Sequence, residues 1–166
     1  DRIEWTAAGK VHVVLRKAGS DKSELCFSYD AMGNRITKKV VAPDGNETFT
    51  YYFRDATGNM MSVFQKEGIA PITAKEHHIY GSKRLGIYNV FKNTSVSIDG
   101  ITHDSSYVGG KSYEFSDHLG NVHLVLSDRL KDAVFENTLA AYEYFPFGML
   151  AQVVENEKYR HLFNGM

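Results

Sequence analysis

The chain has 166 residues, enough for one ordinary domain or a short run of repeats. Its 19 Lys and Arg and 20 Asp and Glu leave a net charge of -1, which gives no electrostatic reason to expect a nucleic acid as a partner. The single cysteine excludes an internal disulfide, and no apolar run reaches the roughly 20 residues of a membrane span, so we expect no membrane insertion. Ten Tyr, ten Phe and 14 Gly favour an all-β chain.

The first predicted strand is the apolar segment Val11–Leu15, preceded by a degraded turn at Thr6–Lys10. A complete turn follows Tyr29, with the pattern Asp-x-x-Gly-Asn. In such a turn the aspartate accepts backbone hydrogen bonds, while the glycine adopts a positive φ angle. Residues 1–24 therefore form a degenerate repeat that precedes the first complete one.

The same turn recurs along the chain, and repeats of this kind determine the fold. The degraded copy and the three complete copies start at residues 6, 30, 55 and 117, so the first two intervals are 24 and 25 residues. A further degraded copy at Phe145–Met149 keeps the glycine. The predicted turn residues are Asp30, Gly33, Asn34, Asp55, Gly58, Asn59, Asp117, Gly120, Asn121 and Gly148, with Tyr29 before the first complete turn.

Other turn signals join these units. Pro43–Asn46 and Asp99–Gly100 each separate two alternating runs, and Gly109–Gly110 marks another turn. Helix is expected at most within Asp128–Glu136. We therefore predict a single domain over residues 1–166: a curled antiparallel sheet of successive β-hairpins with little or no helix.

The turn Tyr29-Asp30-x-x-Gly33-Asn34-Arg35 resembles the YD repeat of RHS proteins, and four later segments resemble the RHS-associated core region of Bacteroidota in the family's own order. These are Glu76–Gly86, Phe115–Val122 with Leu126–Arg129, Tyr144–Met149 and Tyr159–Gly165. The resemblance covers roughly residues 25–165.

This resemblance implies a hollow β-shell that often encloses a toxic cargo domain. It also implies export by a bacterial secretion system, to the cell surface or beyond. The stretch after Gly165 lacks the further repeat and variable tail usual in the family, and the three prolines (Pro43, Pro71 and Pro146) fit no self-cleavage motif. We therefore expect a non-enzymatic shell segment that encloses, caps or docks a partner polypeptide.

Open sheet edges suggest where a partner would bind. The edge strands of a sheet expose unpaired backbone groups, to which another strand can add. We expect the terminal strands to carry such edges, at Val11, Val13 and Leu15 and at Val153 and Val154. The expected partner is a protein: further shell, cargo, an adhesin or a secretion component.

Catalytic and metal chemistry find little support. Adjacent His77 and His78 would point to opposite faces of a strand, and no cysteine pair exists for zinc. Each turn offers one carboxylate, too few for calcium, although a calcium site stays the alternative to turn capping. Cys26 lies within a strand, and His103, Asp104, Ser105 and Ser106 are too close in sequence for a triad. We expect no catalytic residue, no metal and no cofactor.

The aromatic clusters leave a second function open. Tyr51, Tyr52 and Phe53, like Tyr142, Tyr144 and Phe145, could form an exposed platform for a glycan or a peptide. Cross-strand stacking within the sheet explains the same residues, and we favour that interpretation. The alternative function is a free-standing β binding module.

Overall fold

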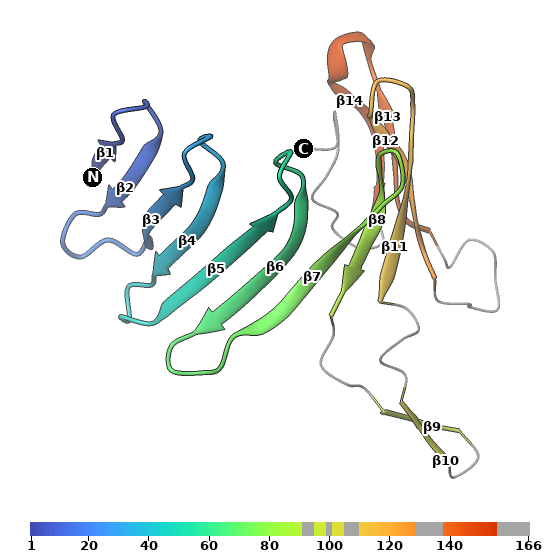
Figure 1. Cartoon of the computed structure of the whole chain (residues 1–166), viewed down its shortest axis with the longest axis horizontal. Helices are drawn as coiled ribbons and strands as arrows, with labels where there is room; N and C mark the ends of the chain where they lie inside the picture. Colours follow the sequence, from blue (N-terminus) through green and yellow to red (C-terminus); the bar gives the residue numbers. More distant parts are fainter. Residues whose placement is uncertain (91–94, 99–100, 105–109, 129–137, 156–166) are drawn as a thin grey trace. The chain divides into compact units, whose positions relative to one another are not determined.

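The computed structural model describes residues 1–90, 95–98, 101–104, 110–128 and 138–155, with backbone alone for 95–98, 101–104 and Glu155. The described chain is all-β (Figure 1). Its strands are β1 (Arg2–Trp5), β2 (Val11–Leu15), β3 (Glu24–Tyr29), β4 (Arg35–Val41), β5 (Glu47–Arg54), β6 (Met60–Glu67), β7 (Thr73–Tyr80), β8 (Arg84–Asn89), β9 (Ser95–Ile98), β10 (Ile101–Asp104), β11 (Lys111–Ser116), β12 (Val122–Ser127), β13 (Thr138–Tyr144) and β14 (Leu150–Glu155).

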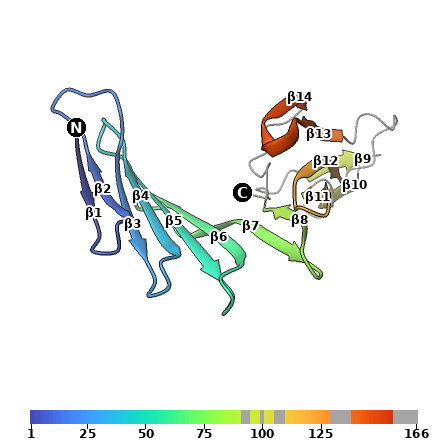
Figure 2. The ribbon, with the colours of Figure 1, turned by 90° about the horizontal axis from the view of Figure 1, so that it is seen from above.

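The chain divides into two compact units, Asp1–His77 and His78–Met166, with the boundary inside β7. In unit 1 each strand pairs antiparallel with the next, in the order β1-β2-β3-β4-β5-β6-β7. Figure 2 shows these strands following one another in a single layer. The prediction of one domain over residues 1–166 stays a prediction.

Unit 2 continues the same strand order with β8-β11-β12-β13-β14, again antiparallel. β9 and β10 form a separate two-stranded ladder in which Ile98 is opposite Ile101. The prediction of an all-β chain of antiparallel hairpins is confirmed. The possible helix within Asp128–Glu136 and the turns at Asp99–Gly100 and Gly109 fall almost wholly outside the described residues; the described chain has one short 3₁₀ segment, Pro146–Gly148.

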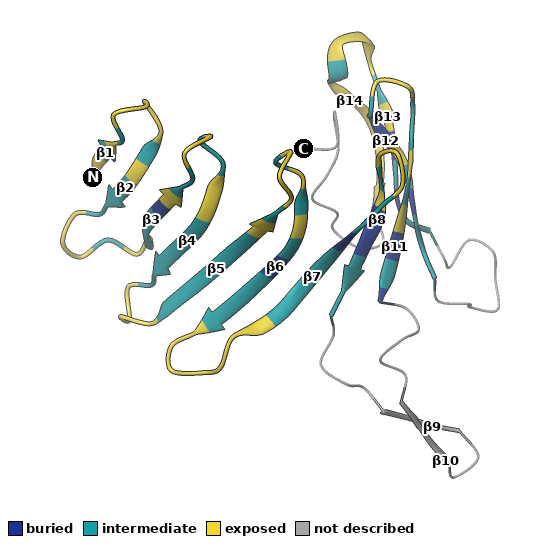
Figure 3. Cartoon of the chain, in the orientation of Figure 1, coloured by how far each residue is buried: buried dark blue, intermediate teal, exposed yellow. Residues whose placement is uncertain are grey.

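Apolar side chains are buried less completely in unit 1 than in unit 2. In unit 1, Phe27 and Val63 are the buried apolar side chains, and most others are half-buried. Unit 2 holds a core in which Val122, Val125, Ala140 and Tyr142 pack together on β12 and β13 (Figure 3). Cys26 is half-buried on β3. Among the described residues, no helix has the length and apolar character needed to span a membrane.

The prediction that Val11, Val13 and Leu15 lie on the N-terminal edge is wrong. These residues belong to β2, which pairs with β1 on one side and with β3 on the other. Charged and apolar residues alternate in Arg2–Trp5, but the run has only four residues and does not predict a strand by itself. It forms a strand by pairing with β2. The edge at this end is β1. At the other end of the strand order lies β14, which carries Val153 and Val154.

Candidate functional sites at the turns and strand edges

Within the described residues, six turns share one pair of backbone hydrogen bonds. The N–H of the first turn residue donates to the carbonyl of the fifth, and the N–H of the fourth donates to the carbonyl of the first. The first residues are Thr6, Asp30, Ala42, Asp55, Asp117 and Phe145. The fourth residue is always glycine, with φ between 72° and 94°. This is the left-handed conformation that closes a three-residue hairpin loop, and side chains other than glycine adopt it at a cost.

In three of these turns an aspartate in first place and an asparagine in fifth place hold the loop from the side. Asp30 Oδ1 accepts the backbone N–H of Asn34 at 2.8 Å, and Oδ2 accepts its side-chain amide at 3.1 Å. The pairs Asp55–Asn59 and Asp117–Asn121 repeat this arrangement. Both carboxylate oxygens therefore already accept hydrogen bonds within the turn, which favours turn capping over calcium binding.

These hydrogen bonds stabilise the charged carboxylates. The side chains of Asn59 and Thr57 lower the pKa of Asp55 from 3.8 to about 2. At Asp117, burial opposes the shift, but hydrogen bonds from Asn121 and His123 outweigh it and lower the pKa to about 2. A lowered pKa in the folded state adds stability above pH 3.8, and this stability is lost as the pH falls towards 2.

We expect a carboxyl-detected NMR titration to give midpoints of about 2 for Asp55 and Asp117. Replacing Asn59→Ala removes the largest contribution at Asp55 and should move its midpoint towards 3.8, while Asp117 keeps its own. Asn46→Ala, in the Ala42 turn, is the matched control and should leave the Asp55 midpoint unchanged. A midpoint of about 4 for Asp55 in the unaltered chain would contradict the capping role.

Five of the turns are followed by a one-residue β-bulge. Around the first turn, Trp5 is opposite Val11 but Glu4 is opposite Val13, so His12 is the extra residue. The corresponding extra residues are Ile36, Met61, His123 and Ala151. A bulge turns the end of the strand away from regular pairing and increases its local twist. The Ala42 turn has no such shift.

Successive hairpins are joined in one constant register, which we call the junction register. Leaving aside the Ala42 turn, which joins two hairpins, the seventh residue after the first residue of one turn is opposite the fourth residue before the next turn. The pairs are Val13–Cys26, Thr37–Tyr51, Ser62–His77 and Leu124–Ala141, where the turn after His77 begins at Gly81. The turn that begins at Gly81 is two residues shorter than the others. At the junction that follows it, the fifth residue after Gly81, which is Gly86, takes the place of the seventh and is opposite Tyr113.

Side chains close the gap that the bulge opens at two of these junctions. The residue just before a turn is Tyr29 in one case and Tyr144 in the other, and their hydroxyls donate to the carbonyls of Val11 and Val122 at 2.8 Å. The bulged histidines make a second link: Nδ1 of His12 lies 3.0 Å from the carbonyl oxygen of Phe27, and Nδ1 of His123 lies 3.2 Å from that of Tyr142.

Sequence reasoning identified Tyr29 through the repeat but missed Tyr144, His12 and His123 as links between hairpins. The available signal was positional. An aromatic residue stands directly before four turn starts, as Trp5, Tyr29, Tyr80 and Tyr144, and a histidine stands six residues after two turn starts.

The histidines considered for metal binding serve other contacts. His77 Nδ1 lies 2.8 Å from Ser62 Oγ, and its ring meets Phe64 edge-on. His78 is buried and stacks on Tyr80. The side chain of His103 and residues Ser105 and Ser106 lie outside the described part. Within that part, no three His, Cys, Asp or Glu side chains are grouped as a metal site would require.

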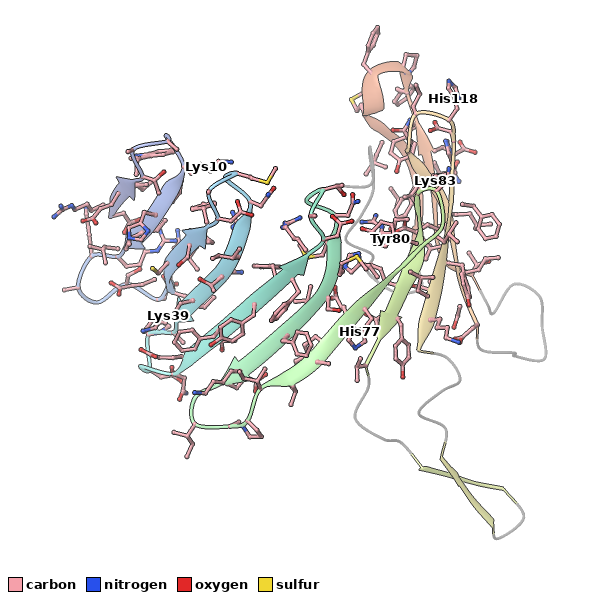
Figure 4. All side chains as sticks on the ribbon, viewed as in Figure 1. Lys10, Lys39, His77, Tyr80, Lys83 and His118 are labelled. Atoms are coloured by element: carbon pink, nitrogen blue, oxygen red, sulfur yellow. The ribbon has the colours of Figure 1, made fainter. Side chains whose placement is uncertain are left out.

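One face of unit 1 carries a row of aromatic contacts. The Phe49 and Tyr51 rings are stacked at 6.3 Å, and Phe53 meets Phe64 edge-on at 5.1 Å. Lys39, labelled in Figure 4, places its ammonium group 5.3 Å from the Phe49 ring centre. Stacking along β5 thus accounts for Phe49 and Tyr51, and cross-strand packing for Phe53 against Phe64 on β6, while Phe53 remains exposed at the end of the row.

A pocket lies between the first two turns of unit 1. Its lining consists of Thr6, Ala7, Ala8, Lys10, Tyr29, Asp30, Ala31, Met32 and Gly33. Lys10 (Figure 4) extends across it, with its ammonium group 5.7 Å from the Tyr29 ring centre. The carboxylate of Asp30 is occupied by Asn34. The pocket therefore presents no set of polar groups arranged for a small ligand.

Solved structures with the same fold are found among large complexes. The chain aligns with a crystal structure of TcdB2-TccC3-Cdc42 at a TM-score of 0.56 and 13% identity, over 98% of its own length. It aligns with TcdB2-TccC3 without the hypervariable C-terminal region at 0.54 and 14%, over 97%. It spans only 8% and 7% of those chains. No protein-family model and no curated protein matches. The likeness supports an RHS/YD-repeat-like fold.

Proposed function

We propose that this chain is a non-enzymatic segment of an RHS-type β-shell, and that it binds a partner polypeptide. The observation that carries the proposal is the strand order: each hairpin pairs with the next, in the junction register at four of the five described junctions, and the order ends in two strands with one described neighbour each. A wall that extends by adding hairpins suits enclosure or capping of another chain. The similarity to TcdB2-TccC3 supports the same role.

The finer parts of the proposal come from the sequence resemblance. We propose a shell of the Bacteroidota type, secreted or held at the cell surface, whose partner is a toxin, an adhesin, a secretion component or further shell. We also propose a role without chemistry. Among the residues that sequence reasoning considered, His77 and the aspartates of the three complete turns make hydrogen bonds within the fold.

The test is affinity capture from the secreted proteins of the source bacterium, followed by a defined binding measurement with the captured protein. We expect one protein to bind with a fixed stoichiometry, and Val153→Lys with Val154→Lys to weaken this binding by at least tenfold. These side chains are 45% and 49% exposed on β14. Met61→Lys, 41% exposed on β6 with a strand on each side, is the matched control and should bind normally.

A second candidate function is the glycan or peptide module. The exposed Phe53 at the end of the aromatic row is the observation that favours it. A glycan array run in parallel separates the two functions. Glycan binding that is lost in Phe53→Ala, without a protein partner, would replace the shell proposal.

A further inference from the structure

The outer edge of β1 is the most exposed apolar strand edge of unit 1. Trp5 is 61% exposed and Ile3 is 50% exposed, although both lie within a regular strand. Among the described residues, β2 is the strand paired with β1. Exposed tryptophan is uncommon on a free surface and frequent in interfaces, where its ring buries a large area and its indole N–H finds an acceptor.

Trp5 occupies a position whose role is visible elsewhere in the fold. It directly precedes the first residue of a turn, as Tyr29 and Tyr144 do. Those two tyrosines donate to the carbonyl of the fifth residue after the start of the preceding turn. Trp5 carries a donor of the same kind, the indole N–H. The described chain offers it no preceding hairpin.

At the other end of the strand order, β14 presents the complementary half of this contact. It is the second strand of its hairpin, as β2 and β12 are of theirs. Each of those second strands pairs with the first strand of the next hairpin. Leu150 is the fifth residue after the start of its turn, so its carbonyl is the position that a donor such as Trp5 would reach.

We propose that β14 of one copy of this chain adds to β1 of a second copy, in the junction register, with Trp5 as the anchor. This register places Gln152 opposite Arg2 and directs the indole N–H of Trp5 to the carbonyl of Leu150. Neither strand contains proline, which would block pairing, and Leu150–Val154 carries no charge. The contact is head-to-tail, so repeated addition generates open chains, or rings where the rotation between copies closes.

Trp5 is the only tryptophan, so its fluorescence reports on this edge alone. The experiment measures emission and sedimentation velocity of the unaltered chain from about 5 µM to about 1 mM, a range chosen for the weak association expected of a small interface. The expected result is growth of species beyond the dimer with concentration, together with a shift of Trp5 emission to shorter wavelength. A chain that stays monomeric with unchanged emission overturns the proposal.

Variants identify the two strands. Val153→Lys with Val154→Lys should abolish association, and Met61→Lys should not. Trp5→Phe keeps a ring but no donor and should associate about fivefold to tenfold more weakly, whereas Trp5→Tyr should restore most of the loss. Association that persists with both β14 lysines would show a β1–β1 contact. Emission shielded at every concentration would show that a segment of the same chain covers Trp5. Either result overturns the proposal.

This inference rests on the proposed function because it names a hairpin of the same class as the partner. The two can fail separately. A monomeric chain that still binds one secreted protein through β14 would refute self-addition and leave the shell role standing.

Discussion

Replacing Gly86→Ala is expected to destabilise unit 2 by about 3 kcal/mol or more, because the added methyl group meets backbone and not a movable side chain. A Cβ atom at this position would lie 2.0 Å from the carbonyl oxygen of Ser112 and 3.1 Å from Cα of Tyr113. Gly86 on β8 is opposite Tyr113 on β11, so the two strands would have to separate. Urea unfolding followed by circular dichroism measures the change.

Gly81→Ala is the matched control for this experiment. Its nearest neighbour would be Cδ1 of Leu85 at 3.3 Å, the end of a side chain that can rotate away. Its φ angle also lies outside the left-handed region. The expected change is within about 0.5 kcal/mol. Equal stability losses in both variants would mean that the close approach of β8 and β11 is not what requires glycine at position 86.

Glu114→Ala is expected to cost about 3–5 kcal/mol, because it removes the carboxylate that the Arg84 guanidinium contacts in a nearly buried place. Both carboxylate oxygens of Glu114 accept Arg84 Nε at 3.0 Å, and Arg84 Nη2 lies 2.9 Å from Oε1. The side chains of Glu114 and Arg84 are 4% and 15% exposed. Two-pronged contacts between Arg and carboxylate are among the stronger ion pairs in proteins.

The double change Arg84→Met with Glu114→Leu should recover most of this loss, since apolar side chains of similar size can replace a buried pair. Glu47→Gln is the control on a more exposed pair: Lys39 Nζ lies 2.7 Å from Glu47 Oε1, with side chains 33% and 41% exposed. Its expected cost is below about 1 kcal/mol. A double variant as unstable as Glu114→Ala would show that packing, and not the loss of the ion pair, dominates at this place.

The turns could be predicted from sequence further than the strands that join them. The turn at Asp30 could be predicted because the residues that identify it also stabilise it: Asp30 and Asn34 by their hydrogen bonds and Gly33 by its positive φ angle. The turns at Thr6 and Phe145 use the same backbone hydrogen bonds without aspartate, because the glycine in fourth place is sufficient. Weak copies of the motif therefore indicated real turns.

Pairing beyond the hairpins could not be predicted from alternation alone. The bulges at His12 and Ile36 shift the register by one residue, and alternating side chains do not reveal such a shift. β1 was missed because Arg2–Trp5, although charged and apolar residues alternate in it, is only four residues long and precedes the first turn that the repeat identified. Gly86 lies 25 residues before the strand that requires it, so its role depends on a contact between distant segments.

The constant junction register has a consequence for how such chains change over generations. A recombination that exchanges one hairpin for another, cut in the loops that join hairpins, keeps the seventh residue opposite the fourth on both sides. The exchanged hairpin then needs no compensating substitution in its neighbours' backbones. One hairpin can thereby replace another that carries different surface side chains, such as the aromatic row of β5 and β6. The surface then changes while the backbone register stays the same.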